Sequence, residues 1–172
     1  MSEEHKRHAG KWKKWLREIL FFTVLLTVVS VGVDLWRSQS VPDDAPFTLK
    51  TLDIQGEPVD IAALSKEQPV IVYFWATWCG VCRFVTPSVN WLSQYYPTIG
   101  ISLSSGSDQK LQQYFASKGL DFQNVNDEKN VLGREWGVAF TPTVFIVRDG
   151  KVAFITSGIT TPPGLLARLW LS

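Results

Sequence analysis

The sequence predicts an α/β domain preceded by a transmembrane helix, and three observations support this fold class. Residues 19–33 contain no charge and directly follow a basic segment. A second apolar run at 70–76 (VIVYFWA) shows no alternation with polar residues, which is typical of a strand covered on both faces. Segments with helical and strand-like spacing then alternate to the end of the chain. A chain of 172 residues, 45% of them hydrophobic, can bury one such core.

The basic segment and the run after it predict a membrane anchor. Residues 1–15 form a tail that is expected to stay in the cytoplasm because it is rich in lysine and arginine. In 19–33, 11 of the 15 residues are Ile, Leu, Phe or Val. A helix over 16–36 would reach about 32 Å, enough to cross a hydrocarbon core of about 30 Å. These features predict a single-pass membrane protein with everything from Arg37 onward outside the membrane, which is the periplasmic side of the bacterial inner membrane if the organism is Gram-negative.

Two other interpretations of this segment stay open. A basic start followed by an apolar stretch would also serve as a cleaved secretory signal, although the Ala-x-Ala pattern of a cleavage site is missing. A buried helix of a soluble protein is the other alternative, but a helix that is apolar on all sides needs a large core around it. Residues 37–46 (RSQSVPDDAP) are polar and contain two prolines, so they predict an extended linker.

Residues 47–172 are expected to form the folded domain. Strands are predicted at 47–52, 58–61, 70–76, 98–103, 122–125, 143–147 and 152–156, and helices at 81–96, 107–118, 128–136 and 162–171. The first two strands predict an edge hairpin, and residues 65–68 predict a loop. Trp75, Trp91 and Trp136 are assigned to packing.

Charge and cysteine content exclude several classes of protein. A formal net charge of +1 provides no positive field for the phosphates of nucleic acid, so no nucleic-acid partner is expected. The only two cysteines, Cys79 and Cys82, exclude a scaffold with several disulfides and any site with four cysteine ligands. The only histidines, His5 and His8, lie in the basic tail, so no metal or other cofactor is expected.

The chemistry is concentrated in residues 78–82 (WCGVC), where the central strand gives way to a helix. Cysteines three positions apart can close a disulfide, and the positive end of the helix stabilises a thiolate. Such sites lower the pKa of a thiol from about 8.5 to roughly 3.5–7.5. We expect Cys79 to face solvent and attack a partner disulfide, and the deeper Cys82 to resolve the mixed disulfide and release the partner reduced. Oxidation of a partner would run in reverse.

These residues resemble the thioredoxin superfamily, from about Phe47 to the end of the chain. Residues 73–83 (YFWATWCGVCR) are similar to its active-site strand and turn, Pro87 to its helix kink, and residues 141–143 (TPT) to its cis-proline loop. The resemblance implies a thioredoxin fold with a mixed central sheet flanked by helices. It also implies that Thr141 and Pro142, together with the turn residues Trp78, Gly80 and Val81, bind the substrate chain. The start of the domain and the long interval before Pro142 are similar to the membrane-tethered TlpA and ResA branch.

The resemblance further implies protein thiols or disulfides as substrates, the reducing direction, and a DsbD-like membrane protein as electron donor. A link to copper tolerance also rests on resemblance alone. A thiol oxidase, a non-catalytic binding module and a copper carrier stay open as alternatives, and a monomer is expected because no long dimerisation helix is present. One departure matters: Tyr73 stands where thioredoxin has a buried aspartate, so a carboxylate proton shuttle for Cys82 is in doubt.

Overall fold

The computed structural model describes residues 14–22, 25 and 49–172. The chain divides into two compact units, Met1–Trp36 and Arg37–Ser172. In the first unit, residues 14–22 and 25 are helical. Within the described residues, no helix combines the length and the apolar character needed to cross a bilayer. Most of the predicted anchor (16–36), and the whole of the linker (37–46), lie outside the described residues, so both stay predictions.

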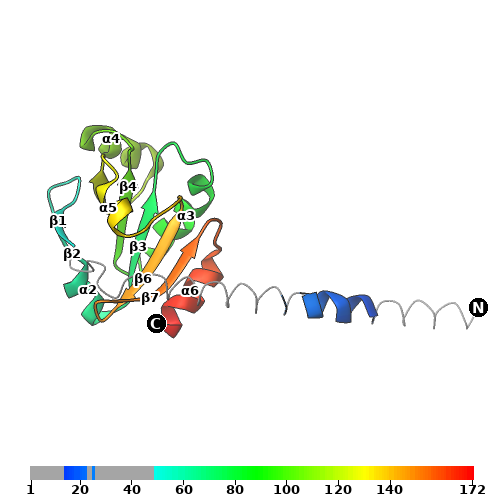
Figure 1. Ribbon diagram of the computed structural model, residues 1–172. Helices are drawn as coiled ribbons and strands as arrows, with labels where there is room; N and C mark the ends of the chain where they lie inside the picture. The colour runs from blue at the N-terminus through cyan, green and yellow to red at the C-terminus, as the bar shows by residue number, and fades with distance from the viewer. Residues whose placement is uncertain (1–13, 23–24, 26–48) are drawn as a thin grey trace, which may run out of the picture. The chain divides into compact units, whose positions relative to one another are not determined.

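The second unit is built around a five-stranded sheet in the order β5-β4-β3-β6-β7. The strands are β3 (Val70–Trp75), β4 (Thr98–Leu103), β5 (Gln123–Asp127), β6 (Thr143–Arg148) and β7 (Lys151–Ser157). Strand β3 is parallel to β4, and β4 is parallel to β5, whereas β6 is antiparallel to both β3 and β7. Figure 1 shows β3 between β4 and β6. The mixed sheet and the central place of the 70–76 run are therefore confirmed.

Helices cover both faces of this sheet. Alternate residues of β3 point to opposite sides, so the strand contributes side chains to a core on each face. Ile71, Tyr73 and Trp75 face a core that also holds side chains of α3 (Cys82–Leu92), α4 (Asp108–Lys118) and α6 (Pro162–Leu171). Val70, Val72 and Phe74 face a second core, closed by residues of α2 (Ile61–Glu67) and by Trp136, which follows α5 (Val131–Glu135). All six residues of β3 are buried, as expected for a strand covered on both faces.

The predicted hairpin forms a separate two-stranded sheet of β1 (Lys50–Leu52) and β2 (Pro58–Asp60), rather than an edge of the main sheet. Its turn lies beside β5, where the backbone N–H of Ile54 donates to the carbonyl of Asn124 at 2.8 Å. The hairpin therefore flanks the open edge of β5 without extending the ladder.

One predicted loop is wrong, because residues 65–68 largely belong to α2. Asp60 caps this helix by accepting a hydrogen bond from the Ala63 N–H at 2.9 Å. Ser65 is fully buried, and its hydroxyl accepts a hydrogen bond from the Gly150 N–H at 3.0 Å. Ser65 therefore faces the β6–β7 turn, whereas Lys66 and Glu67 of the same helix are exposed to solvent.

Candidate active site

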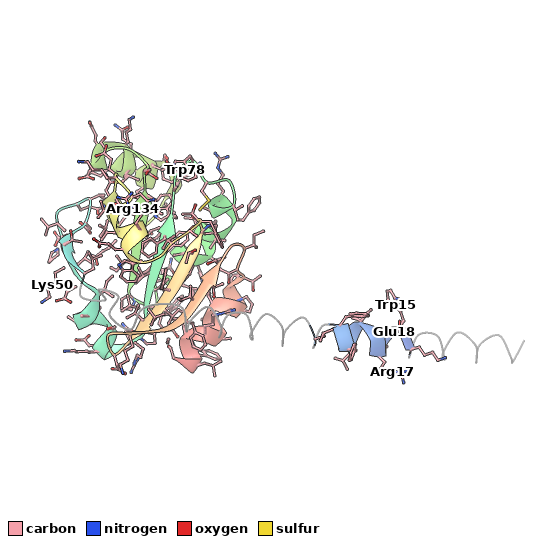
Figure 2. The ribbon with its side chains drawn as sticks, viewed as in Figure 1. Trp15, Arg17, Glu18, Lys50, Trp78 and Arg134 are labelled. Carbon is pink, nitrogen blue, oxygen red and sulfur yellow. A yellow bond between two sulfur atoms is a disulfide. The ribbon has the colours of Figure 1, made fainter. Side chains whose placement is uncertain are left out.

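The two cysteines form a disulfide at the end of the central strand. Strand β3 ends at Trp75, a turn carries Cys79, and α3 begins at Cys82. Cys79 and Cys82 are disulfide-bonded, with their Cα atoms 5.3 Å apart. Figure 2 shows the labelled Trp78 at the end of the domain toward which β3 runs. Strand β3 and the helix that follows it thus bring the redox pair to the carboxyl end of the parallel strands, where ligands of open α/β sheets bind.

Hydrogen bonds and burial distinguish the two sulfur atoms. The backbone N–H of Cys82 donates to Cys79 Sγ at 3.1 Å, and the amides of the first turn of α3 lie behind it. Cys82 is 1% exposed and Cys79 is 6% exposed. Cys82 is therefore the more shielded of the two, as expected, but the expectation that Cys79 faces solvent is wrong for the disulfide form. The turn and the proline loop enclose it, and a partner must fit into that enclosure to reach its sulfur.

The proline loop predicted from residues 141–143 lies against the disulfide. The Thr141–Pro142 peptide bond is cis, and the carbonyl oxygen of Thr141 is 3.6 Å from Cys79 Sγ. The carbonyl of Pro142 accepts a hydrogen bond from the Gly158 N–H at 2.8 Å, which joins this loop to the segment after β7. The fold therefore brings Thr141 and Pro142, about 60 residues away along the chain, to the redox pair.

Two serines that the sequence did not single out support the turn from the other side. The indole N–H of Trp78 donates to the Ser104 carbonyl at 3.1 Å, and the Thr77 N–H donates to the Ser105 hydroxyl at 3.0 Å. Trp78 is nevertheless 65% exposed. Its ring is thus held in one orientation while most of its surface stays open to a partner. A backbone carbonyl carries no sequence signal, so the role of Ser104 was not predictable.

Exposed apolar side chains outside the predicted set also lie on the segments that adjoin the disulfide and the proline loop. Phe84 is on the first turns of α3, Phe140 directly precedes Thr141, and Ile159 directly follows Gly158. They are exposed by 76%, 53% and 74%. Together with Trp78 and Val81 they form what we name the apolar rim. An exposed cluster of large apolar side chains around a buried reactive group is typical of a surface that docks another polypeptide.

Tyr73 occupies the core behind Cys82. The Tyr73 hydroxyl lies 2.9 Å from Thr86 Oγ1, and the Thr86 hydroxyl donates to the Cys82 carbonyl at 2.8 Å. Burial raises the pKa of Tyr73 far above its ordinary value, a shift that the hydrogen bond to Thr86 opposes only in part. The phenol is therefore neutral at physiological pH and supplies no carboxylate-like base to Cys82.

The tryptophans that the sequence assigned to packing have mixed outcomes. Trp75 and Trp136 are buried as expected, whereas Trp91 packs against the ring of Tyr95 but is 43% exposed, so it is not part of the core. Among the residues that the structure describes, no three His, Cys, Asp or Glu side chains are grouped as a metal site would require. The site as described consists of one disulfide, a proline loop and an apolar rim.

A redox-active cysteine pair at this point of a thioredoxin-like fold defines a class, the thiol-disulfide oxidoreductases, and comparisons with known proteins agree. The family described as AhpC/TSA matches residues 39–155, more than half of the chain, so the chain belongs to that family. A thioredoxin-like protein of Haemophilus influenzae is 32% identical over 164 residues, which cover 94% of this chain and 97% of the relative. The thiol:disulfide interchange protein HelX of Rhodobacter capsulatus is 34% identical over 152 residues, covering 81% and 85%.

A solved structure supports the fold independently. The secreted Mycobacterium tuberculosis disulfide oxidoreductase homologous to Escherichia coli DsbE superposes with a TM-score of 0.63. It is 24% identical, and the match covers 75% of this chain and 99% of that one. The thioredoxin-like fold implied by the resemblance is therefore confirmed, and the protein is a thiol-disulfide oxidoreductase related to the TlpA, ResA and DsbE proteins.

Proposed function

We propose that the protein is a membrane-anchored periplasmic enzyme that reduces disulfides of partner proteins, with Cys79 as nucleophile and Cys82 as resolving thiol. The observation that carries the proposal is the environment of Cys79 Sγ. It accepts the Cys82 N–H, lies at the start of α3 and faces the Thr141 carbonyl across 3.6 Å. An amide donor and a helix N-terminus both favour a thiolate at Cys79 once the disulfide is reduced.

The exchange balances without a further group. A Cys79 thiolate attacks one sulfur of a partner disulfide, the other partner sulfur leaves as a thiolate, and a mixed disulfide remains. Deprotonated Cys82 then attacks Cys79, which restores the intramolecular disulfide and releases the second partner thiolate. Two electrons pass to the partner. The enzyme must then be reduced again, and we assign that step to a DsbD-like membrane protein.

Docking at the apolar rim and at Thr141, Pro142, Gly80 and Val81 supports protein substrates. Gly80 and Val81 are exposed on the turn beside Cys79. The anchor rests on the charge and apolarity of the first 36 residues. The combination of one anchor with Cys-Gly-Val-Cys is similar to the suppressor-of-copper-sensitivity protein D of Gram-negative bacteria, and from that likeness we propose that the protein has a role in copper tolerance.

Trapping of mixed disulfides tests the assignment of the two cysteines. In the full chain, Cys82→Ser leaves a nucleophile without its resolving partner, so it should accumulate mixed disulfides that dissociate under dithiothreitol on a non-reducing gel. The matched control Cys79→Ser retains Cys82, which is 1% exposed, and should trap little. Equal trapping by both variants, or trapping by Cys79→Ser alone, would contradict the assignment.

The reduction potential tests the direction. Equilibration of the full chain in glutathione buffers, followed by tryptophan fluorescence, should give a potential near that of thioredoxin, about −270 mV. A value near that of DsbA, about −120 mV, would identify an oxidase instead.

Extraction of the membrane fraction with carbonate, followed by a measurement of the mass of the retained chain, tests the anchor. A full-length chain that stays in the membrane pellet supports the anchor, whereas a soluble chain that has lost N-terminal residues indicates a cleaved signal.

A further inference from the structure

The outer face of α3 carries a cavity whose lining extends from Arg83, the residue after Cys82, to Gln94 beyond the end of the helix. The cavity, of about 600 Å³, runs between α3 and α4 and ends near Leu120. This volume falls within the range of sites for small ligands, roughly 300–1,000 Å³. Trp91, which the sequence assigned to packing, lines the cavity together with Tyr114 of α4. The Trp91 ring makes an edge-to-face contact with Tyr95, with ring centroids 5.5 Å apart, and 43% of its surface stays exposed and available to a ligand.

The walls of the cavity are fixed by hydrogen bonds. Asn90 of α3 donates from its amide to the Gly119 carbonyl at 3.1 Å, and its amide oxygen accepts the Asp121 N–H at 2.8 Å. Thr86, also in the lining, is buried and bonded to Tyr73 and to the Cys82 carbonyl. These contacts tie α3 to the segment after α4, so a ligand meets a preformed site and spends little free energy on ordering it.

The charge of the lining has one sign. Its only charged side chains are Arg83 of α3 and Lys118 of α4, and no Asp or Glu lines the cavity. In the described part of the chain the ion pairs are Lys50–Asp60 and Arg148–Asp149, so neither lining cation is neutralised by a carboxylate. Residues 49–172 contain ten basic and ten acidic residues, so this local excess does not follow from the composition of the domain. Two cations beside a partly apolar cavity attract an anion.

We propose that the α3–α4 cavity binds a small organic anion with an aromatic ring, of the class of aromatic carboxylates and sulfonates. The ring packs against Trp91 and Tyr114, whose faces suit offset or edge-to-face contact. The anionic group lies between Arg83 and Lys118, and the side-chain amide of Gln94 in the lining offers a further donor. The site is distinct from the thiol exchange at Cys79, and its occupancy does not depend on the proposed redox direction.

Calorimetric titration of the full chain with naphthalene-2-sulfonate tests this site. We expect one site per chain, with naphthalene-2-sulfonamide, a neutral analogue of the same ring, binding at least 5-fold more weakly. Lys118→Glu and Arg83→Glu should each weaken sulfonate binding at least 10-fold. The matched control is Lys110→Glu, the same charge reversal on α4 outside the lining, and it should change the affinity less than 2-fold.

A tryptophan pair tests the aromatic contact. Trp91→Ala should weaken binding at least 5-fold, whereas Trp170→Ala, which removes an exposed tryptophan of α6, should not. Unfolding temperatures of all variants check that the fold is retained. Absence of binding at 1 mM sulfonate, or equal affinity in Lys118→Glu, Lys110→Glu and wild type, would overturn the proposal. None of these results depends on trapping at Cys79, so failure here and failure of the proposed function are separate.

Discussion

The phenol oxygen of Tyr73 lies 2.9 Å from Thr86 Oγ1, and the direction of this hydrogen bond is fixed by a third group. Thr86 donates its only hydroxyl hydrogen to the Cys82 carbonyl, which can accept but not donate. Tyr73 must therefore be the donor to Thr86. The pair ends on a backbone carbonyl next to the resolving thiol and holds that first turn of α3 in place. It carries no group that takes up a proton near neutral pH.

Removing the hydroxyl of Tyr73 should lower the free energy of unfolding by an amount that depends on pH. Tyr73→Phe deletes one buried hydrogen bond and should lower the free energy of unfolding at pH 7 by about 1 kcal/mol. The ordinary tyrosine pKa is about 10, and burial raises the pKa of Tyr73 above it. Above about pH 10 the unfolded chain loses this proton while the folded chain keeps it, so wild-type stability falls as pH rises. Tyr73→Phe lacks that loss. The difference in free energy of unfolding between wild type and Tyr73→Phe, measured by urea unfolding, should therefore narrow from pH 9 to pH 11. A gap that widens over this range would contradict the assigned burial of the phenol.

The same neutral phenol predicts an unchanged pH profile for catalysis. A group that neither gains nor loses a proton between pH 6 and pH 9 cannot set the pH dependence of the rate of resolution by Cys82 in that range. In stopped-flow measurements on preformed mixed disulfides, Tyr73→Phe should shift the rate without moving the apparent pKa of the profile. A displaced apparent pKa in Tyr73→Phe would show that Tyr73 takes part in proton transfer.

The sequence predicted the elements that depend on local pattern and missed those that depend on distant contacts. The run at 70–76 and the strand at 98–103 are correct because burial on both faces leaves an unbroken apolar signal. The end of helix α2 was missed because residues 65–68 are all polar, although Lys66 and Glu67 lie on its exposed face and Ser65 is buried against the β6–β7 turn. That contact is invisible along the chain.

Trp91 illustrates a different failure, one of helical geometry. The buried stripe of α3 consists of Cys82, Val85, Thr86, Val89 and Leu92. Trp91 is one position from Leu92, about 100° around the helix, so it points away from the core. The size of Trp91 suggested packing in the core, but the positions of the buried residues around α3 place Trp91 on the opposite, exposed face of the helix. The same geometry places Phe84 in the apolar rim, a residue that the sequence motif did not include.

The apolar rim should set affinity for protein substrates and not for small disulfides. Phe140→Ser and Ile159→Ser each remove exposed apolar surface next to Pro142, so neither should weaken the fold. Each lost contact of about 1.4 kcal/mol corresponds to a 10-fold rise in KM for a protein disulfide. Reduction of glutathione disulfide, which is too small to span the rim, should change less than 2-fold. The matched control Leu171→Ser removes an equally exposed side chain at the end of α6 and should leave both substrates unaffected. Equal losses with the protein and with glutathione disulfide would assign these residues to the chemistry and not to docking.

Gly100 shows how little room the sheet leaves behind the active-site strand. It pairs with Tyr73 on β3 and with Asn124 on β5. A Cβ at this position would lie 2.6 Å from the ring of Phe122 and 2.7 Å from the Asn124 amide oxygen. Neither neighbour can retreat, because Phe122 is buried against Phe115 and the Asn124 oxygen accepts the Trp75 indole N–H at 3.0 Å.

Gly100→Ala should therefore lower the free energy of unfolding by about 1 to 3 kcal/mol, the range typical of overpacked cores. Gly80 is the matched control, since an added Cβ there meets nothing within 4 Å and its backbone is not left-handed. Gly80→Ala should stay within about 0.5 kcal/mol of wild type, as is usual for surface substitutions. Urea unfolding of the oxidised proteins measures both. A Gly100→Ala variant as stable as wild type would mean that the Phe122 ring and the Trp75–Asn124 hydrogen bond behind β3 are not as tightly held as the contacts indicate.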